Sequence, residues 1–162
     1  MFKEHTCLVF PCFGISVYQF IKNNNYSAFE YDAVKQMGRE IINAVKFLHS
    51  MKLIHTDLKP ENLLRINSSY TTRKARPEEI KRDMMSGSKR NSQSETIGIL
   101  RIPDDSSLKV IDFGSAIFEN DHHSRIIQTR HYRAPEVIFG LPWSYASDVW
   151  SVGCMIFEIY TG

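Results

Sequence analysis

The stretch Leu53 to Leu64, LIHTDLKPENLL, most constrains the fold because it encloses charged and amide side chains between two apolar ends. Apolar ends of this kind are typical of core segments, so the polar middle must be a loop that its flanks hold in place. Within the loop a carboxylate (Asp57), an ammonium group (Lys59) and an amide (Asn62) follow at short intervals. An ordinary surface turn does not require this order of groups. The stretch therefore predicts a polar site presented by a folded core.

These three side chains match the chemical needs of phosphoryl transfer. Asp57 can accept the proton of an attacking hydroxyl, Lys59 can neutralise a phosphate in transfer, and the amide oxygen of Asn62 can bind a divalent cation. The order H-x-D-L-x-x-x-N is the signature of the protein kinase catalytic loop. For this motif alone, a purely structural loop is the alternative.

Two later motifs follow in the order that such a site requires. In VIDFGSA, Asp112 directly follows a predicted strand, where a carboxylate can hold magnesium against phosphates. TRHYRAPEV closes the segment that begins at Asp112, and Thr129 lies near enough to its end to hydrogen bond Asp57 and Lys59. Three motifs in one order are far more specific than any of them alone.

The apolar pattern predicts helices and strands that could carry these motifs. Apolar residues recur at three- and four-residue intervals from Tyr31 to Ser50, which predicts a helix, and a shorter helix is expected over Ser16 to Asn23. Leu63 to Ile66 and Leu108 to Ile111 are short apolar runs between polar clusters. We expect them to pair as strands and so to place Asn62 beside the residue that follows the second run.

The segment Ser147 to Tyr160 is apolar on almost every face, which predicts a helix in the middle of the protein. Asp148 lies at its start, where its carboxylate could accept hydrogen bonds from the backbone of the catalytic loop. An ordinary acidic residue at a helix N-terminus is the alternative for this position.

Residues 67 to 107 form an insert rich in Ser, Arg, Lys, Asp and Glu and poor in large apolar side chains. Such a segment buries too little surface to offset its ordering entropy, so we predict that it is mostly disordered. Its basic clusters suggest nucleic-acid binding as an alternative, but a solvated insert is favoured and no direct nucleic-acid contact is expected. The clusters are Arg73, Lys74 and Arg76, and Lys89 and Arg90.

Composition excludes several classes of protein. The 162 residues are 43% hydrophobic with a net charge of +2, and no apolar run approaches the roughly 20 residues of a membrane span. The three cysteines are odd in number and show no metal-ligand spacing, so neither a disulfide framework nor a zinc site is predicted. This cysteine usage fits a reducing compartment. We interpret His122 and His123 as a solvated loop pair and Cys12 as unreactive.

In these motifs the sequence resembles the eukaryotic protein kinases, and more narrowly the LAMMER or CDC-like dual-specificity kinases. The narrower resemblance rests on HTDLKPENLL, with Thr56 where most kinases carry arginine, and on VIDFGSA, TRHYRAPEV and WSYASDVWSVGC. It implies an α+β, protein kinase-like fold, mainly the helical C-terminal lobe, lacking most of the N-terminal β lobe. It also implies Asp57 as catalytic base, Lys59 as phosphate-neutralising residue, and Asn62 and Asp112 as magnesium ligands.

By the same resemblance, the opening CLVFPCFG is the last strand of the small lobe and the hinge that contacts ATP. Phe10 is implied as gatekeeper, with the Pro11 carbonyl and the Phe13 amide facing adenine above an apolar floor of Leu64 and Ile111. Proline departs from the acidic residue expected at that position, but it still supplies the carbonyl because it lacks only the N–H.

We therefore expect one partial kinase domain over residues 1–162, acting on Ser and Thr hydroxyls, with Tyr left open. The sequence holds no G-x-G-x-x-G loop and no V-A-I-K-like strand, so we expect this chain to be inactive by itself. A non-catalytic truncated kinase that serves as a binding or competitor module is the alternative. The expected parts are the small-lobe strand and hinge (1–14), helices, catalytic loop and strand (15–66), insert (67–107), activation segment (108–136) and truncated central helix (137–162).

The resemblance also implies partners and a location. Arginine-serine-rich splicing factors are the implied protein substrates, and the nucleus is the implied location, with the cytoplasm left open. No membrane partner is expected.

We predict that activation does not depend on phosphorylation of the activation loop. The neutral hydroxyl of Thr56 cannot form the bidentate pair with a phosphorylated residue that arginine forms. Phosphatase treatment of a full-length form should therefore leave most of its activity, and a large loss would contradict the prediction.

Overall fold

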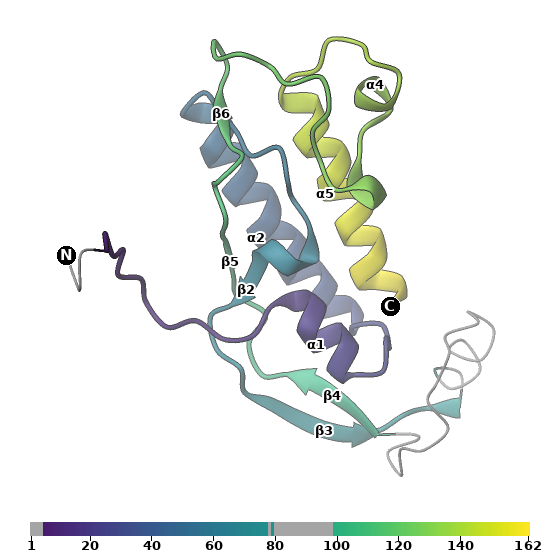
Figure 1. Ribbon diagram of the computed structural model, residues 1–162. Helices are drawn as coiled ribbons and strands as arrows, with labels where there is room; N and C mark the ends of the chain where they lie inside the picture. Colours follow the sequence, from purple (N-terminus) through teal and green to yellow (C-terminus); the bar gives the residue numbers. More distant parts are fainter. Residues whose placement is uncertain (1–4, 78, 80–98) are drawn as a thin grey trace.

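Two long antiparallel-packed helices, α2 and α5, form the body of the computed structural model, with short strands along one side of α2 (Figure 1). The structure describes residues 5–77, 79 and 99–162. Within these ranges no helix has both the length and the apolar character needed to cross a bilayer. The helices are α1 (Val17–Asn23), α2 (Tyr31–Ser50), α4 (Pro135–Ile138) and α5 (Tyr145–Thr161), and the strands are β1 (Leu53–Ile54), β2 (Leu63–Arg65), β3 (Tyr70–Lys74), β4 (Ile99–Pro103), β5 (Leu108–Val110) and β6 (Ile117–Phe118).

The core forms where the apolar stripe of α2 meets α1 and α5. Met37 and Ile41 of α2 are buried in one cluster with Phe20 of α1 and with Met155 and Ile159 of α5. Each such side chain contributes about 1.5–3 kcal/mol when fully buried. The predicted bounds of α2 are confirmed, and the shorter predicted helix begins one residue later, after Ser16 caps it by accepting a hydrogen bond from Gln19 N–H.

The two strands predicted beside the catalytic loop also pair as expected. β2 runs antiparallel to β5, with Leu63 opposite Val110 and Arg65 opposite Leu108. The first strand is one residue shorter than predicted, and so is the second. Two further antiparallel pairs join β1 to β6 and β3 to β4.

The predicted disorder of residues 67–107 is wrong for both ends of the insert, because these form the β3–β4 pair. Polar contacts rather than a large apolar surface dock this pair. The Asn24 side-chain amide donates to the Arg101 carbonyl at 3.1 Å and accepts from the Arg101 N–H at 2.8 Å. It thus satisfies both backbone groups of Arg101, as the backbone of a neighbouring strand would. The second basic cluster, Lys89 and Arg90, lies outside the described residues.

Arg65 secures the start of the insert from inside the core. Its side chain is fully buried, with the guanidinium carbon 4.5 Å from the centroid of the Phe20 ring. One guanidinium nitrogen donates to the Ser69 carbonyl at 2.7 Å. A charged residue in this place interrupts the apolar pattern of the strand, so the sequence gives no indication of its burial.

The predicted strand at the start of the chain does not form among the described residues. From Cys7 to Phe13 no backbone hydrogen bond joins the segment to the other described residues, and Val9 is 95% exposed. Pairing begins only at Gly14, whose N–H donates to the Arg65 carbonyl at 2.8 Å. A strand needs a neighbour to receive its backbone hydrogen bonds, and the described residues place none beside this segment (Figure 1).

The helix predicted at Ser147 to Tyr160 forms as part of α5 (Tyr145–Thr161). Met155 and Ile159 of α5 face the core, whereas Val149, Trp150 and Phe157 are largely exposed. The apolar character of the helix is therefore confirmed, but only one of its faces is covered among the described residues.

The ion pairs of Arg73 predict a specific titration. Its guanidinium donates to Glu79 at 2.6 Å and to Glu30, at the start of α2, at 2.8 Å. The hydrogen bond from Arg73 lowers the pKa of Glu79 from 4.5 to about 2. Because the folded-state pKa is depressed, the Arg73–Glu79 pair stabilises the folded start of the insert fully above pH 4.5 and loses its effect as the pH falls toward 2.

We expect carbon-detected NMR to show Glu79 titrating near pH 2, and Arg73→Met to move that midpoint back toward 4.5. Lys74→Met, on the next and exposed residue of β3, is the control and should leave the midpoint in place. An unchanged midpoint in Arg73→Met would show that the pair does not form.

Candidate active site

A buried carboxylate at the start of α5 holds the backbone of the predicted catalytic loop. Asp148 is 0% exposed and accepts hydrogen bonds from the His55 N–H at 2.9 Å and the Thr56 N–H at 3.0 Å. The His49 ring, at the end of α2, lies 2.9 Å from the same carboxylate. The predicted contact between Asp148 and the loop is confirmed, and the carboxylate is acceptable inside the core because donors surround it.

The loop presents Asp57 with both of its carboxylate oxygens bound. Lys59 donates to Oδ2 at 2.6 Å, while the Thr129 hydroxyl and N–H donate to Oδ1 at 2.7 and 3.2 Å. Lys59 also donates to the Thr129 hydroxyl at 3.2 Å. Partial burial by itself would raise the pKa of Asp57, but the hydrogen bonds from Lys59 and Thr129 outweigh it and hold that pKa below its ordinary value. The carboxylate is therefore ionised at neutral pH and can accept a proton.

The strand pair brings Asn62 and Asp112 together, as predicted. The Asn62 side chain donates through Nδ2 to the Asp57 carbonyl at 2.9 Å. The Asn62 carbonyl accepts from the Ile111 N–H at 3.0 Å, which places the next residue, Asp112, at the same end of the pair. Asp112 has a left-handed backbone, with φ 66°, and its Oδ1 accepts from the Gly114 N–H at 3.3 Å.

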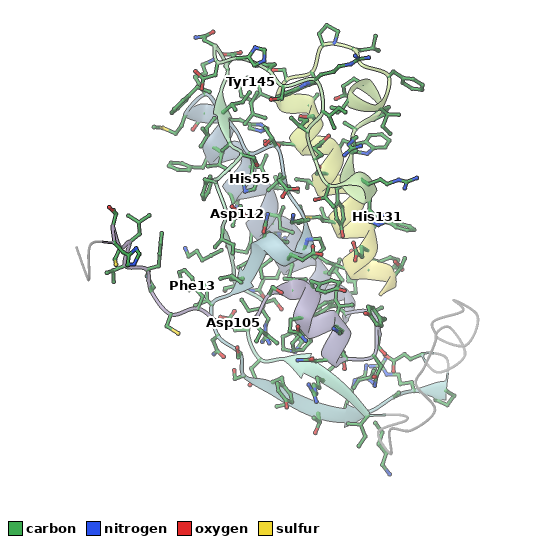
Figure 2. The ribbon with its side chains drawn as sticks, viewed as in Figure 1. Phe13, His55, Asp105, Asp112, His131 and Tyr145 are labelled. Atoms are coloured by element: carbon green, nitrogen blue, oxygen red, sulfur yellow. The ribbon has the colours of Figure 1, made fainter. Side chains whose placement is uncertain are left out.

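His55 completes this end of the site, and the sequence reasoning gave it no role. Its Nε2 lies 3.1 Å from the Ile111 carbonyl, and its ring centroid lies 5.2 Å from that of Phe113. Figure 2 shows His55 and Asp112 close together in the middle of the molecule. His55 therefore supports the turn that carries Asp112, and its place two residues before Asp57 in the motif was the available signal.

The residues at this end fit a magnesium ion chemically. Magnesium prefers hard oxygen ligands and keeps several waters, so one carboxylate and one amide oxygen are a sufficient protein contribution. Because Asn62 uses Nδ2 as a donor to Asp57, its amide oxygen is the atom left for a cation. Asp112 is exposed and would supply the carboxylate.

The residues implied for ATP lie in two places. Leu64 and Ile111 are half-buried at the β2–β5 pair, and Leu64 lies on the face of β2 opposite to the buried Leu63. Phe13 is half-buried on the segment that leads toward the N-terminus (Figure 2), whereas Phe10 and Pro11 are exposed. The described residues thus bring Leu64 and Ile111 together but do not enclose an adenine site with Phe10 and Pro11. Their roles stay predictions.

A pocket of about 510 Å³ opens beside Asp57 on the side of the activation segment. Thr56, Ser115 and Thr129 line its polar part, and Ile126 contributes apolar surface. A hydroxyl-bearing peptide placed against Asp57 would extend into this space.

The sequence reasoning missed the contacts that Thr56, Gln128 and His123 make in the activation segment. The Thr56 hydroxyl donates to the Ser115 carbonyl at 2.9 Å, and the Thr56 carbonyl accepts from the Gln128 N–H at 3.0 Å. His123 is not a freely solvated residue, because its ring stacks on Trp143 at 4.4 Å and its nitrogens lie 3.1 Å from two backbone carbonyls. No local pattern marks Gln128 or His123, since several of their partners, such as Ser147, Ser151 and Trp143, lie about 20 residues away.

Comparison with known proteins gives one consistent result. The sequence model of the protein kinase domain family matches residues 2–162. Serine/threonine-protein kinase AFC2 of Arabidopsis thaliana is 44% identical over 161 residues, which is 99% of this chain and 35% of the relative. Dual specificity protein kinase CLK1 of Homo sapiens is 47% identical over 158 residues, covering 98% of this chain and 29% of the relative.

A solved crystal structure of a kinase domain has the same fold. It superposes with a TM-score of 0.81 at 38% identity, covering 99% of this chain and 43% of the solved chain. The chain therefore spans about a third of the length of these two curated relatives and less than half of the solved structure. The predicted kinase-like fold and the predicted resemblance are confirmed.

We predict that Asp148→Asn destabilises the fold by about 1–3 kcal/mol, the cost of leaving a buried donor without its acceptor. The amide nitrogen of asparagine cannot accept, so one of the donors His49, His55 or Thr56 loses its partner. Urea denaturation measures the difference. Asp121→Asn is the control, because Asp121 accepts a similar bond from the Phe118 N–H at an exposed site and should change stability by less than about 0.5 kcal/mol. Equal effects of the two substitutions would contradict the prediction.

Proposed function

The chain belongs to the protein kinase domain family, and on this premise we propose that it is the catalytic and magnesium-binding half of an ATP-dependent protein kinase. The proposed reaction transfers the γ-phosphate of ATP to Ser and Thr hydroxyls of proteins. The names of the relatives describe them as serine/threonine-protein kinases and as dual specificity protein kinases, so transfer to Tyr belongs to the same proposal.

The observation that carries the proposal is the state of the Asp57 carboxylate. Hydrogen bonds from Lys59 and Thr129 fix its orientation and keep it ionised. Oδ1 already accepts two hydrogen bonds from Thr129, whereas Oδ2 accepts only the one from Lys59. Oδ2 therefore keeps a lone-pair direction with which it can accept the proton of a substrate hydroxyl. Lys59 lies within hydrogen-bond distance of that acceptor, where its positive charge can stabilise the phosphate oxygens during transfer.

Asn62 and Asp112 are the residues proposed to hold magnesium, and Leu64 and Ile111 are proposed to lie against the adenine of ATP. When bound, magnesium neutralises charge on the transferring phosphate. The backbone hydrogen bond from the Ile111 N–H to the Asn62 carbonyl fixes the backbone of Asn62 relative to that of Asp112. The spacing of the two proposed magnesium ligands therefore depends on strand pairing rather than on flexible side chains.

Two further parts of the proposal rest on the resemblance. Arginine-serine-rich splicing factors are the proposed substrates and the nucleus is the proposed location. A peptide assay can test the substrate class directly, because an arginine-serine repeat and its tyrosine counterpart differ only at the residue that would accept the phosphate.

The test is phosphotransfer by a hybrid kinase in which residues 2–162 replace the aligned residues of the human relative. We expect the hybrid to transfer phosphate from magnesium-ATP to a serine-containing arginine-serine peptide. Asp57→Asn should reduce kcat by about 10²- to 10⁴-fold, the usual contribution of a general base. Asp121→Asn, on an exposed turn, is the control and should leave kcat unchanged.

Each result of this experiment has a definite meaning. A hybrid that binds magnesium-ATP but shows no turnover on Ser, Thr or Tyr peptides would overturn the proposed catalytic function. Turnover that persists in Asp57→Asn would remove Asp57 from its proposed role. Turnover that is lost when Ser is replaced by Tyr would restrict the substrate class to Ser and Thr.

A further inference from the structure

Gln128, the residue before Thr129, has an unusual backbone in a buried place. It is 7% exposed and has φ 66°, in the left-handed region. A residue with a side chain costs about 1–3 kcal/mol in such a conformation and keeps it only where its surroundings enforce it. The contacts around Gln128 are therefore strong enough to hold this turn.

The side-chain amide of Gln128 uses both of its donors and its acceptor. Nε2 donates to the Ser147 carbonyl and to the Ser151 hydroxyl, both at 2.7 Å. Oε1 accepts from the Ala134 N–H at 2.9 Å. One neutral group thus joins the activation segment to two turns of α5 and to the residue that precedes α4.

The backbone of Gln128 makes a second set of contacts. Its N–H donates to the Thr56 carbonyl at 3.0 Å, and its carbonyl accepts from Arg133 at 2.8 and 3.2 Å. Thr56 itself has φ 68° and holds the other end of the segment through the Ser115 carbonyl. The catalytic loop and both ends of the segment are consequently linked through neutral residues and one arginine.

This anchoring determines where the next residue lies. With Gln128 fixed on four sides, Thr129 is directed at the catalytic carboxylate and donates its N–H and hydroxyl to Asp57 Oδ1. Rotation of the Gln128 turn would carry both donors away from Asp57, because they belong to the adjacent residue. Small misplacements of this kind have large effects on a reacting group, as a shift of about 1 Å can cost about 10²-fold in rate.

We propose that Gln128 is a positioning residue for phosphotransfer, whose side-chain amide locks the activation segment onto α5 and so places Thr129 against Asp57. This inference rests on the proposed kinase function for its effect on rate. Its structural part is the attachment of the activation segment to α5 by the Gln128 amide, which we call the lock. The lock does not depend on turnover and can be measured separately.

The test compares two substitutions in the hybrid kinase. Gln128→Met keeps the length of the side chain and removes the amide, and Gln128→Glu keeps an acceptor for the Ala134 N–H but loses both donors. We expect each to reduce kcat by about 10- to 100-fold, while the Kd for magnesium-ATP changes by less than about twofold, since Gln128 contacts none of the residues proposed for nucleotide. Gln19→Met is the matched control, because the Gln19 amide makes a bond at 2.7 Å to Asn23 on the surface of α1.

A second measurement, on the chain itself, does not need activity. In Gln128→Met, amide hydrogen exchange at Thr129 should rise at least about tenfold, because its N–H loses the fixed contact with Asp57. Exchange at His55 and Thr56, which Asp148 binds, should stay unchanged.

The outcomes separate this inference from the proposed function. Absence of turnover in the unsubstituted hybrid would overturn the function, while faster exchange at Thr129 alone would still support the lock. Exchange at Thr129 that is unchanged, or a kcat of Gln128→Met within twofold of the parent, would overturn the positioning role. A loss of nucleotide binding in proportion to kcat would show that Gln128 only maintains the fold, and would overturn it as well.

Discussion

The Asp148 carboxylate is the contact on which the rest of the site depends. It is fully buried, yet the N–H groups of His55 and Thr56 and the ring of His49 surround it. A buried charge without such donors would cost several kcal/mol, whereas a fully hydrogen-bonded one fixes its partners in a single arrangement. Because those partners come from α2 and from the catalytic loop, one side chain of α5 sets the position of the loop relative to both long helices.

Polar contacts extend from this point to the reacting carboxylate. Thr56 connects the fixed loop to Gln128, and the next residue, Thr129, binds Asp57. Thr56, Gln128 and Asp112 all have left-handed backbones, with φ between 66° and 68°. Strained conformations persist where surrounding contacts enforce them, and these three lie at residues that direct Asp57 or are proposed to hold magnesium. The core supplies the rigidity that this arrangement requires.

The two strands of the insert are ordered mainly by polar contacts rather than by apolar burial. Its described ends pair as strands and dock through the Asn24 amide, the Arg73 ion pairs and the buried Arg65 rather than through a large apolar surface. The compositional argument for disorder assumes that apolar burial is the main source of order. Here a few polar contacts, together with the burial of Leu100, suffice for the two strands next to the core.

The sequence by itself determined the elements whose cause is local. The apolar period of Tyr31–Ser50 predicts α2 to the residue, and the order of the three motifs predicts which side chains meet at the site, because periodicity and short-range motif geometry are properties of consecutive residues. Only the tertiary structure decided what Gln128 and Thr56 contact, since their partners lie far away in the chain. It also decided that residues 7–14 form no strand, because a strand exists only where another strand accepts and donates its hydrogen bonds.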